Sequence, residues 1–201
     1  MAPDPGYMNP PRRPRKKRGR ESSSTGAHLT PLPAGRPPSV SLAYRVGLGN
    51  DLHRLAKGRK LILGGVHVPF DQGPVGHSDG DVLAHAICDA LLGAARLGDI
   101  GRHFPNTSPQ WKNVSSLLFL RHVRALLDAA GFSIVNIDAT IGLERPKLAP
   151  HIPPMEAEVA AALGIAPAQV SVKAKSGEGM DAVGRGEAVR ADAVALLQRR
   201  P

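Results

Sequence analysis

The sequence predicts one domain of layered α and β structure, in which helices pack on a mixed β-sheet. Segments with the alternating pattern of strands and segments with helical spacing interleave from about residue 43 to the C-terminus. Short loops rich in glycine and proline separate these segments. The 201 residues are enough for one domain with a hydrophobic core. These observations leave open whether the arrangement is α+β or α/β.

The first 44 residues differ in composition from the rest of the chain. They carry eight Lys or Arg and two Asp or Glu, so about six of the nine net positive charges lie there. Because they hold little apolar surface to bury, we expect a disordered basic extension over residues 1–44 and a domain over residues 45–201. The extension could also bind nucleic acid or an anionic membrane, or serve as a transit peptide.

The composition also excludes some classes of protein. No apolar run is long enough for the core of a signal peptide or for a membrane span. The single cysteine, Cys88, excludes an intrachain disulfide framework and suits a reducing compartment.

The first elements of the domain are a strand and a hairpin. Residues 43–49 form a short strand candidate. Residues 60–70 contain two short apolar runs around Gly64 and Gly65, and a Gly-Gly pair between such runs is typical of a tight hairpin turn.

The strongest helix prediction covers residues 80–98. Apolar residues recur there at three- and four-residue spacing, which is the period of a helix with one buried face. Asp79 or Asp81 can cap the start of this helix, and Gly98 lies just beyond its end.

The rest of the domain alternates in the same way. In chain order we expect a polar loop (99–113), a helix (114–131), a strand (132–143) and a proline-rich loop (144–154). A helix ending near residue 164, a strand (169–176), a glycine-rich loop (177–186) and a final helix (187–200) follow.

Asp51 and His53 are the first candidates for chemistry. In an extended segment, residues two apart point to the same side, so these two side chains can converge on one point. A carboxylate and an imidazole are good ligands for Zn²⁺ or a similar divalent ion. Two ligands do not make a tight site, and a chance pair in a loop is the alternative.

His85 is the candidate for the third ligand. It shares one face of the predicted helix with Asp81 and Asp89, each four residues away. A ligating histidine usually has a carboxylate or carbonyl that fixes its other nitrogen, and both aspartates are placed to supply it. The alternative is a partly buried histidine paired with a carboxylate.

His77 and Ser78 precede the same helix. A helix N-terminus offers free backbone N–H groups, which favour a phosphate there, and both side chains could add donors. The two aspartates nearby argue against a bare anion site unless a metal ion offsets their charge. A simple helix-capping loop is the alternative.

The C-terminal half offers further phosphate and metal ligands. Lys173, Lys175 and Ser176 could contact phosphate oxygens, and Glu178 could hold a second metal ion. The alternative is a strand end followed by a solvated charged loop. Lys147 lies in the proline-rich loop, and the last two candidates, which could form an ion pair, are Arg185 and Glu187.

These candidates belong to a series of longer motifs. In chain order the motifs are NDLH, GGVHVPF, GHSDGDVLAHAICDALLGAARLGDIGRHFP, IDATI, RPKLAPHIPPM, VKAKSGEG and GRGEA. From about residue 45 to the C-terminus, their order and spacing resemble the 2-C-methyl-D-erythritol 2,4-cyclodiphosphate synthase family. Because all the motifs occur together, the resemblance is more specific than any one of them.

The resemblance implies a fold, an assembly and a reaction. The fold is α+β, a small mixed sheet with helices packed on one face, assembled as a homotrimer with active sites between neighbouring subunits. The reaction is that of a metal-dependent lyase of the non-mevalonate isoprenoid pathway. It converts 4-diphosphocytidyl-2-C-methyl-D-erythritol 2-phosphate to 2-C-methyl-D-erythritol 2,4-cyclodiphosphate and releases CMP.

The resemblance also implies two metal ions. Asp51, His53 and His85 match the ligands of Zn²⁺ or another divalent ion, and Asp51 and His53 also match residues that bind the substrate. Glu178 matches the glutamate that holds Mg²⁺ or Mn²⁺ at the substrate diphosphate.

The remaining site residues follow from the same resemblance. It assigns catalytic roles to His77, Ser78, Lys175, Ser176 and Glu178. His77 and Ser78 also match residues that hold phosphate and the erythritol part. Further substrate-binding positions at the erythritol are Asp99, Ile100 and Gly101. Those around the cytidine are Lys147, Leu148, Ala149, Ala174, Lys175 and Ser176. Arg185 is also expected at the substrate, and together with Glu187 it matches the lining of the central trimer cavity.

A second hypothesis comes from another class of protein. A non-catalytic descendant would keep the metal-binding trimer and use its basic tail for regulation or for attachment to nucleic acid. We favour the enzyme, because an unfilled cluster of charges beside histidines costs stability. We expect no membrane or nucleic-acid partner and a bacterial cytoplasmic location, with a plastid as the alternative if the tail is a transit peptide.

Overall fold

The computed structural model describes residues 43–201. The predicted disordered extension therefore lies outside the described residues, except for its last two positions. The second of these, Tyr44, already belongs to the first strand. Within the described part, no helix has the length and apolar character needed to cross a membrane.

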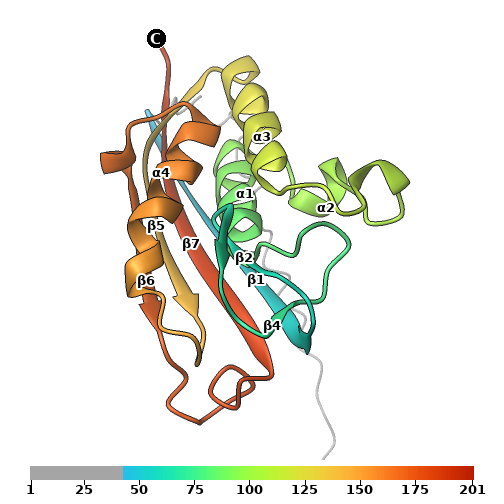
Figure 1. Cartoon of the computed structure of the whole chain (residues 1–201). Helices are drawn as coiled ribbons and strands as arrows, with labels where there is room; N and C mark the ends of the chain where they lie inside the picture. Colours follow the sequence, from blue (N-terminus) through green and yellow to red (C-terminus); the bar gives the residue numbers. More distant parts are fainter. Residues whose placement is uncertain (1–42) are drawn as a thin grey trace, which may run out of the picture. The chain divides into compact units, whose positions relative to one another are not determined.

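Most of the described strands form one mixed sheet, as the sequence predicts (Figure 1). Its order is β4-β1-β7-β5-β6, and only the β5–β6 pair is parallel. The predicted hairpin forms a separate pair of strands, β2 and β3. The strands are β1 (Tyr44–Lys57), β2 (Leu61–Leu63), β3 (Val66–Val68), β4 (Gln72–Pro74), β5 (Phe132–Gly142), β6 (Val170–Lys175) and β7 (Ala188–Arg199).

The three longer helices pack on the same face of this sheet. α1 (Val82–Ala95) lies over β1 and β7, while α3 (Leu117–Ala129) contacts β5 and α4 (Ile152–Leu163) contacts β6. The helices also contact one another, and the hydrophobic core lies between them and the sheet. The α+β fold with helices on one face is therefore confirmed. Shorter helical turns are α2 (Ile100–His103), η1 (Pro109–Trp111), η2 (Ala149–His151) and η3 (Pro167–Gln169).

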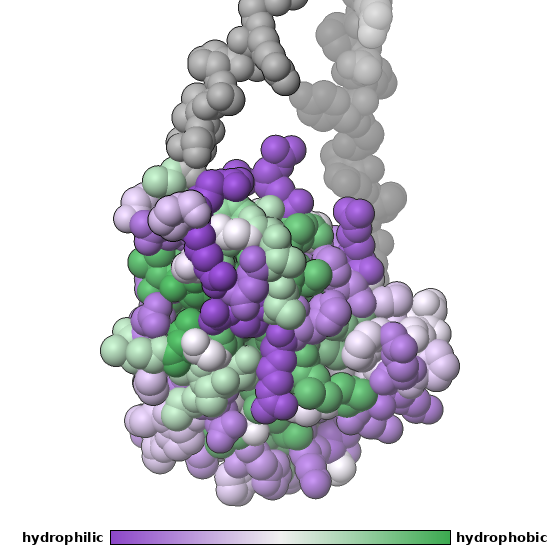
Figure 2. Space-filling model, turned by 90° about the horizontal axis from the view of Figure 1, so that it is seen from above, coloured by the Kyte–Doolittle hydropathy of each residue, from purple (hydrophilic) through white to green (hydrophobic). Residues whose placement is uncertain are grey.

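The opposite face of the sheet has no covering layer within the described residues. The residues of β1 and β7 that point there include large exposed apolar side chains: Tyr44, Val46, Leu48, Leu52 and Val194. Figure 2 views the domain from above rather than onto this sheet face, and there too hydrophobic side chains lie at the surface between hydrophilic ones. An apolar sheet face of this kind is typical of a surface that meets another protein.

The final helix expected over residues 187–200 is wrong, because this segment is strand β7 at the centre of the sheet. Its alanines and leucines are good helix formers, but its buried positions recur at every second residue. Val189, Ala191 and Ala193 are buried, whereas Arg190 and Val194 are exposed. Pairing with strands on both sides decides the conformation, and the small alanines leave room for α1 above them.

Other boundaries also differ from the prediction. The first strand does not stop at residue 49 but continues to Lys57, so Asp51 and His53 lie within it. The loop expected over 99–113 contains α2 and η1, and the loop expected over 144–154 contains η2 and the first turn of α4. These turns are too short to show a helical period.

The predicted helix at residues 80–98 is α1, and Asp81 is the residue that caps it. Its carboxylate accepts hydrogen bonds from the first-turn N–H groups of Leu83 and Ala84 and from the hairpin N–H groups of Gly64 and Gly65. Burial, with a contribution from a neighbouring carboxylate, raises the pKa of Asp81 to about 6. One side chain therefore fastens the β2–β3 turn to the start of α1.

α1 lies directly on β1 because two glycines of the strand face it. A Cβ added at Gly47 would clash with the carbonyl oxygen of Ala90, and one added at Gly49 would lie 2.6 Å from the amide nitrogen of the same residue. These neighbours are helix backbone, which cannot move aside as a flexible side chain can. Only glycine permits this separation, and the separation sets how far His85 on α1 stands from the strand.

We expect Gly49→Ala to lower the free energy of unfolding by about 3 kcal/mol, because the methyl group must push α1 away from β1. Gly93→Ala is the matched control, since Gly93 is an exposed helix position whose added Cβ meets nothing within 4 Å. The control should leave stability unchanged or raise it by about 0.5–1 kcal/mol. Urea unfolding followed by circular dichroism measures both, and equal stabilities for the two variants would contradict the close-contact argument.

Candidate metal centre and its pocket

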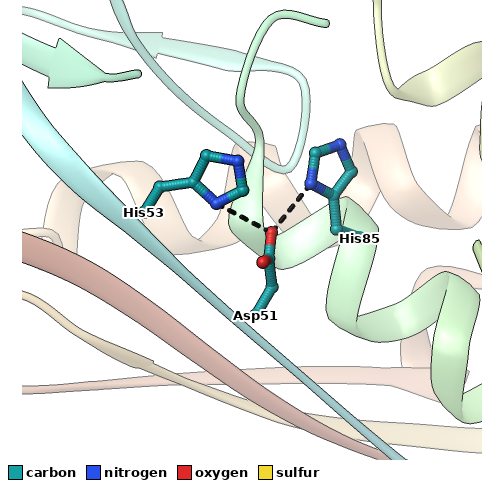
Figure 3. Close-up of side chains that lie close together, drawn as sticks. All are labelled: Asp51, His53 and His85. Atoms are coloured by element: carbon teal, nitrogen blue, oxygen red, sulfur yellow. Dashed lines mark hydrogen bonds and ion pairs between the residues drawn. The ribbon is translucent and has the colours of Figure 1, made fainter. Parts of the chain in front are cut away.

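Asp51, His53 and His85 meet at one point, as the sequence predicts (Figure 3). Asp51 and His53 occupy alternate positions of β1 on the face that α1 covers, and His85 lies in the second turn of α1. Oδ2 of Asp51 is 2.8 Å from Nδ1 of His85 and 3.1 Å from Nδ1 of His53. One ligand atom from each residue lies within 4.8 Å of the others.

The charges at this point favour a cation. Burial alone would raise the pKa of Asp51, but the two adjacent imidazoles outweigh it and lower this pKa to about 2. Burial alone would lower the pKa of His85, but the Asp51 carboxylate outweighs that and raises this pKa above its ordinary value. Nδ1 of His53 is buried and, although it lies 3.1 Å from Oδ2 of Asp51, it has no hydrogen bond of normal geometry within the described residues.

The donor set fits a divalent metal ion. One carboxylate oxygen and two imidazole nitrogens are ligands that Zn²⁺ accepts, and three protein ligands leave one position open for a substrate oxygen. Nδ1 of His53 and Nδ1 of His85 both lie close to one oxygen of Asp51, so the three ligand atoms face the same point. Within residues 43–201, no other group of three such side chains has this geometry.

The cluster opens into a cavity of about 620 Å³. The wall includes four further residues expected at the substrate: His77, Ser78, Ile100 and Gly101. Aromatic side chains complete it, where Phe104 stacks on Phe119 at a centroid separation of 4.3 Å. A polar end with metal ligands and an apolar wall are typical of a small-molecule site.

Two of the expected residues have other contacts. Nε2 of His77 lies 3.1 Å from the carbonyl oxygen of Ser108, so this nitrogen donates to the loop that forms the wall. Asp99 does not line the cavity, because its carboxylate caps α2 by accepting from the N–H group of Arg102. Asp99 therefore contributes to the cavity through the position of α2.

The expectation that Asp81 and Asp89 fix the second nitrogen of His85 is wrong. Asp81 is occupied with the helix cap, and Oδ1 of Asp89 accepts from the N–H group of Ile100 at 2.7 Å, which anchors α2 to α1. Nε2 of His85 instead lies 2.9 Å from Oγ of Ser116. The sequence analysis missed Ser116, because it lies 31 residues from His85 and no local spacing links them.

A second group of expected residues surrounds a separate cavity of about 300 Å³. All six positions expected around the cytidine line it: Lys147, Leu148, Ala149, Ala174, Lys175 and Ser176. The first three precede α4, Ala174 and Lys175 end β6, and Ser176 follows that strand. This cavity shares no lining residue with the cavity that contains the metal ligands.

The remaining expected residues lie away from the Asp51 cluster. Glu178 accepts a hydrogen bond from the hydroxyl of Ser176 and has φ of 50°. Arg185 forms the expected ion pair with Glu187, with two hydrogen bonds of 3.1 Å, and lines a third cavity. Glu178 is not part of the cluster that the three metal ligands form within one chain.

Comparison with known proteins adds a family and several close relatives. The model of the YgbB family matches residues 44–198. The 2-C-methyl-D-erythritol 2,4-cyclodiphosphate synthase of Desulfosudis oleivorans is 60% identical over 153 residues, which cover 76% of this chain and 91% of that protein. A bifunctional enzyme IspD/IspF of Anaeromyxobacter sp. is 58% identical over 154 residues, but this match spans only 40% of the longer protein.

Solved structures show the same fold. A CDP-bound 2C-methyl-D-erythritol-2,4-cyclodiphosphate synthase matches with a TM-score of 0.71 and 38% identity, over 77% of this chain and all of that chain. The bifunctional IspDF of Campylobacter jejuni matches with a TM-score of 0.75 and 35% identity, over 78% of this chain and 42% of its own length.

We expect metal binding to weaken as the pH falls from about 8 to about 6, by up to about tenfold per pH unit. The pKa of His85 is raised above its ordinary value, so as the pH falls protons increasingly compete with the metal for His85, while Asp51, with a pKa of about 2, stays ionised. Titration of Zn²⁺ against a chromophoric chelator at several pH values measures the affinity. An affinity that does not change over this range would contradict the assignment of His85 as a ligand.

Proposed function

The chain belongs to the YgbB family, and we propose that it performs the reaction of the 2-C-methyl-D-erythritol 2,4-cyclodiphosphate synthases. The reaction is a step of non-mevalonate isoprenoid precursor synthesis and forms the cyclic diphosphate with release of CMP. The observation that carries the proposal is the 60% identity over 91% of the Desulfosudis oleivorans synthase. The Asp51, His53 and His85 cluster in a cavity of suitable size agrees with it.

In the proposed reaction, the 2-phosphate of the substrate attacks the β-phosphorus of the diphosphate. A bond forms between an oxygen of the 2-phosphate and this phosphorus, and the bond to the oxygen shared with the α-phosphate breaks, so that CMP leaves. No general base is needed, because the attacking phosphate is already anionic. The protein can therefore contribute mainly by positioning the two phosphates and neutralising their charge.

The metal cluster supports a role in binding the diphosphate. A divalent ion held by Asp51, His53 and His85, Zn²⁺ in our proposal, would act as a Lewis acid on a phosphate oxygen. Beside it, Ser78 lines the same cavity and can donate its hydroxyl hydrogen to a phosphate. We assign Glu178 to a second ion, Mg²⁺ or Mn²⁺, at the same diphosphate.

The other walls of the two cavities have separate roles in this proposal. His77, Ile100 and Gly101 would contact the phosphate and the erythritol part, with Asp99 acting through the position of α2. The cytidine would bind in the second cavity, where Lys147, Lys175 and Ser176 can reach the phosphates beside it and the last two would take part in catalysis with Glu178.

We further propose a homotrimer with each active site between two subunits. The metal ligands and the proposed cytidine pocket line separate cavities of one chain, so a neighbouring subunit could bring one beside the other. The uncovered sheet face supplies an apolar surface for such an assembly. In this arrangement Arg185 and Glu187 would line the central cavity.

We expect Leu48→Arg to reduce the assembly to a smaller species, because it places a charge on the uncovered face of β1, where Leu48 is 68% exposed. Leu118→Arg is the matched control, since Leu118 is 47% exposed on α3, away from that face. Sedimentation velocity gives the mass of each variant. A native monomer, or a trimer that survives Leu48→Arg unchanged, would refute this use of the sheet face.

The extent of the catalytic domain is part of the proposal. We assign the activity to residues 45–201, and the family model matches residues 44–198. The basic extension lies outside both the family match and the described residues. Its role and the cytoplasmic location of the protein stay predictions. The alternative, a non-catalytic metal-binding trimer, differs in one measurable way, which is that it would release no CMP.

We expect the native protein to release CMP from 4-diphosphocytidyl-2-C-methyl-D-erythritol 2-phosphate when Mg²⁺ and Zn²⁺ are present. Asp51→Ala should lower the rate by about 10²-fold or more, because it removes a group that holds the ion at the developing charge. Glu158→Ala, at an exposed position of α4, should have the native rate. Chromatographic measurement of CMP tests this, and no release by folded, zinc-loaded native protein would favour the non-catalytic alternative.

A further inference from the structure

The second nitrogen of His85 has a buried partner that no motif indicated. Ser116 precedes α3 and is fully buried, and its Oγ lies 2.9 Å from Nε2 of His85. Ser116 is itself held by Asp79. One oxygen of Asp79 accepts from the Ser116 hydroxyl, and the other accepts from the Ser116 backbone N–H group at 2.9 Å.

The positions of the hydrogen atoms follow from this chain of contacts. An ionised carboxylate can only accept hydrogen bonds, so the hydroxyl hydrogen of Ser116 points to Asp79. Oγ of Ser116 must then accept the bond that it shares with His85, and the donor is an N–H group at Nε2. A neutral imidazole with its hydrogen on Nε2 has its lone pair on Nδ1, and Nδ1 is the nitrogen that faces Asp51.

We propose that Ser116, oriented by Asp79, is a positioning residue of the metal centre that holds His85 in the tautomer able to bind the ion through Nδ1. Nδ1 of His85 lies 2.8 Å from Oδ2 of Asp51, so in this tautomer both lone pairs are directed at the position of the ion, and the ion takes the place of the proton that could otherwise join the two atoms. The inference rests on the proposed metal site and not on the reaction.

Ser78 is the only competing hydroxyl at this nitrogen within the described residues, and its contacts are longer. Its Oγ lies 3.2 Å from Nε2 of His85 and 3.4 Å from Oγ of Ser116. Ser78 also lines the cavity, whereas Ser116 does not. The two serines therefore have different roles, with Ser116 directed at the ligand and Ser78 at the cavity.

Backbone hydrogen bonds keep the partners of His85 in register. The N–H group of Asp79 donates to the carbonyl of Val114 at 3.1 Å, and the N–H group of Asn113 donates to the carbonyl of His77 at 2.9 Å. These bonds join the loop before α1 to the segment before α3. Ser116 thus reaches His85 from a segment that backbone hydrogen bonds tie to the loop before α1, which is the kind of support that a positioning residue requires.

The first test is the Zn²⁺ affinity of Ser116→Ala, measured by competition with a chromophoric chelator. We expect a dissociation constant about 10- to 100-fold higher than that of the native protein, because His85 loses the acceptor that fixes its tautomer. Ser115→Ala is the matched control, since Ser115 is the exposed neighbour. It should bind Zn²⁺ as the native protein does.

A second variant tests the direction of the hydrogen bonds. In Asp79→Asn, the amide oxygen can accept from the Ser116 N–H group while the amide nitrogen donates to Oγ, which turns the hydroxyl hydrogen toward His85. The lone pair of His85 must then lie on Nε2 and the hydrogen on Nδ1, so the dissociation constant for Zn²⁺ should again rise about 10- to 100-fold. A purely structural role for Asp79 would not exchange the tautomers.

Nitrogen NMR of the imidazole groups, at a pH where His85 is neutral, reads the tautomer directly. We expect the hydrogen on Nε2 in the metal-free native protein and on Nδ1 in Asp79→Asn. A hydrogen on Nδ1 in the native protein overturns the inference, even if Ser116→Ala does not fold. Folded Ser116→Ala with native affinity also overturns it. Failure of the native protein itself to bind Zn²⁺ would instead refute the proposed metal site.

Discussion

The architecture depends on the close approach of α1 to β1. Gly47 and Gly49 leave no side chain between the strand and the helix backbone, so the two elements are closer than ordinary side chains allow. This separation brings His85 within 2.8 Å of Asp51. Other residues of α1 and its cap then position the neighbouring segments. Asp81 binds the β2–β3 hairpin to the start of the helix, and Asp89 binds α2. The contact between α1 and β1 thus brings the metal ligands of both elements together, and α1 in turn positions α2 in the cavity wall.

The four aspartates around His85 show how the local environment gives the same carboxyl group different pKa values and different roles. Asp51 faces two imidazoles and has a pKa of about 2, whereas burial and the nearby Asp79 carboxylate raise the pKa of Asp81 to about 6, although backbone N–H groups that donate to it act in the opposite direction. Asp79 and Asp89 accept hydrogen bonds from Ser116 and Ile100. Only one of the four carboxylates therefore meets the histidines as a ligand, and the other three support the loops and helices that carry the site.

Local patterns predicted much of the fold and part of the site. Helical spacing identified α1, the Gly-Gly pair identified the hairpin, and period-two geometry indicated that Asp51 and His53 converge. The helix prediction for residues 187–200 was wrong, because the alanines of this segment favour a helix while pairing with β1 and β5 makes it a strand. Ser116 was missed because its contact with His85 depends on how two loops meet, and no spacing along the chain encodes that contact.

The alternation of side chains along β1 couples two surfaces that have no contact with each other. Gly47, Gly49, Asp51 and His53 point toward α1, while Leu48 and Leu52 point to the uncovered face. Insertion of a single residue early in this strand would exchange the faces, placing leucines against the helix and metal ligands in the open. Substitutions on the uncovered face of β1 should therefore be tolerated, whereas insertions and deletions should not. The spacing from Tyr44 to His53 is then inherited as one unit.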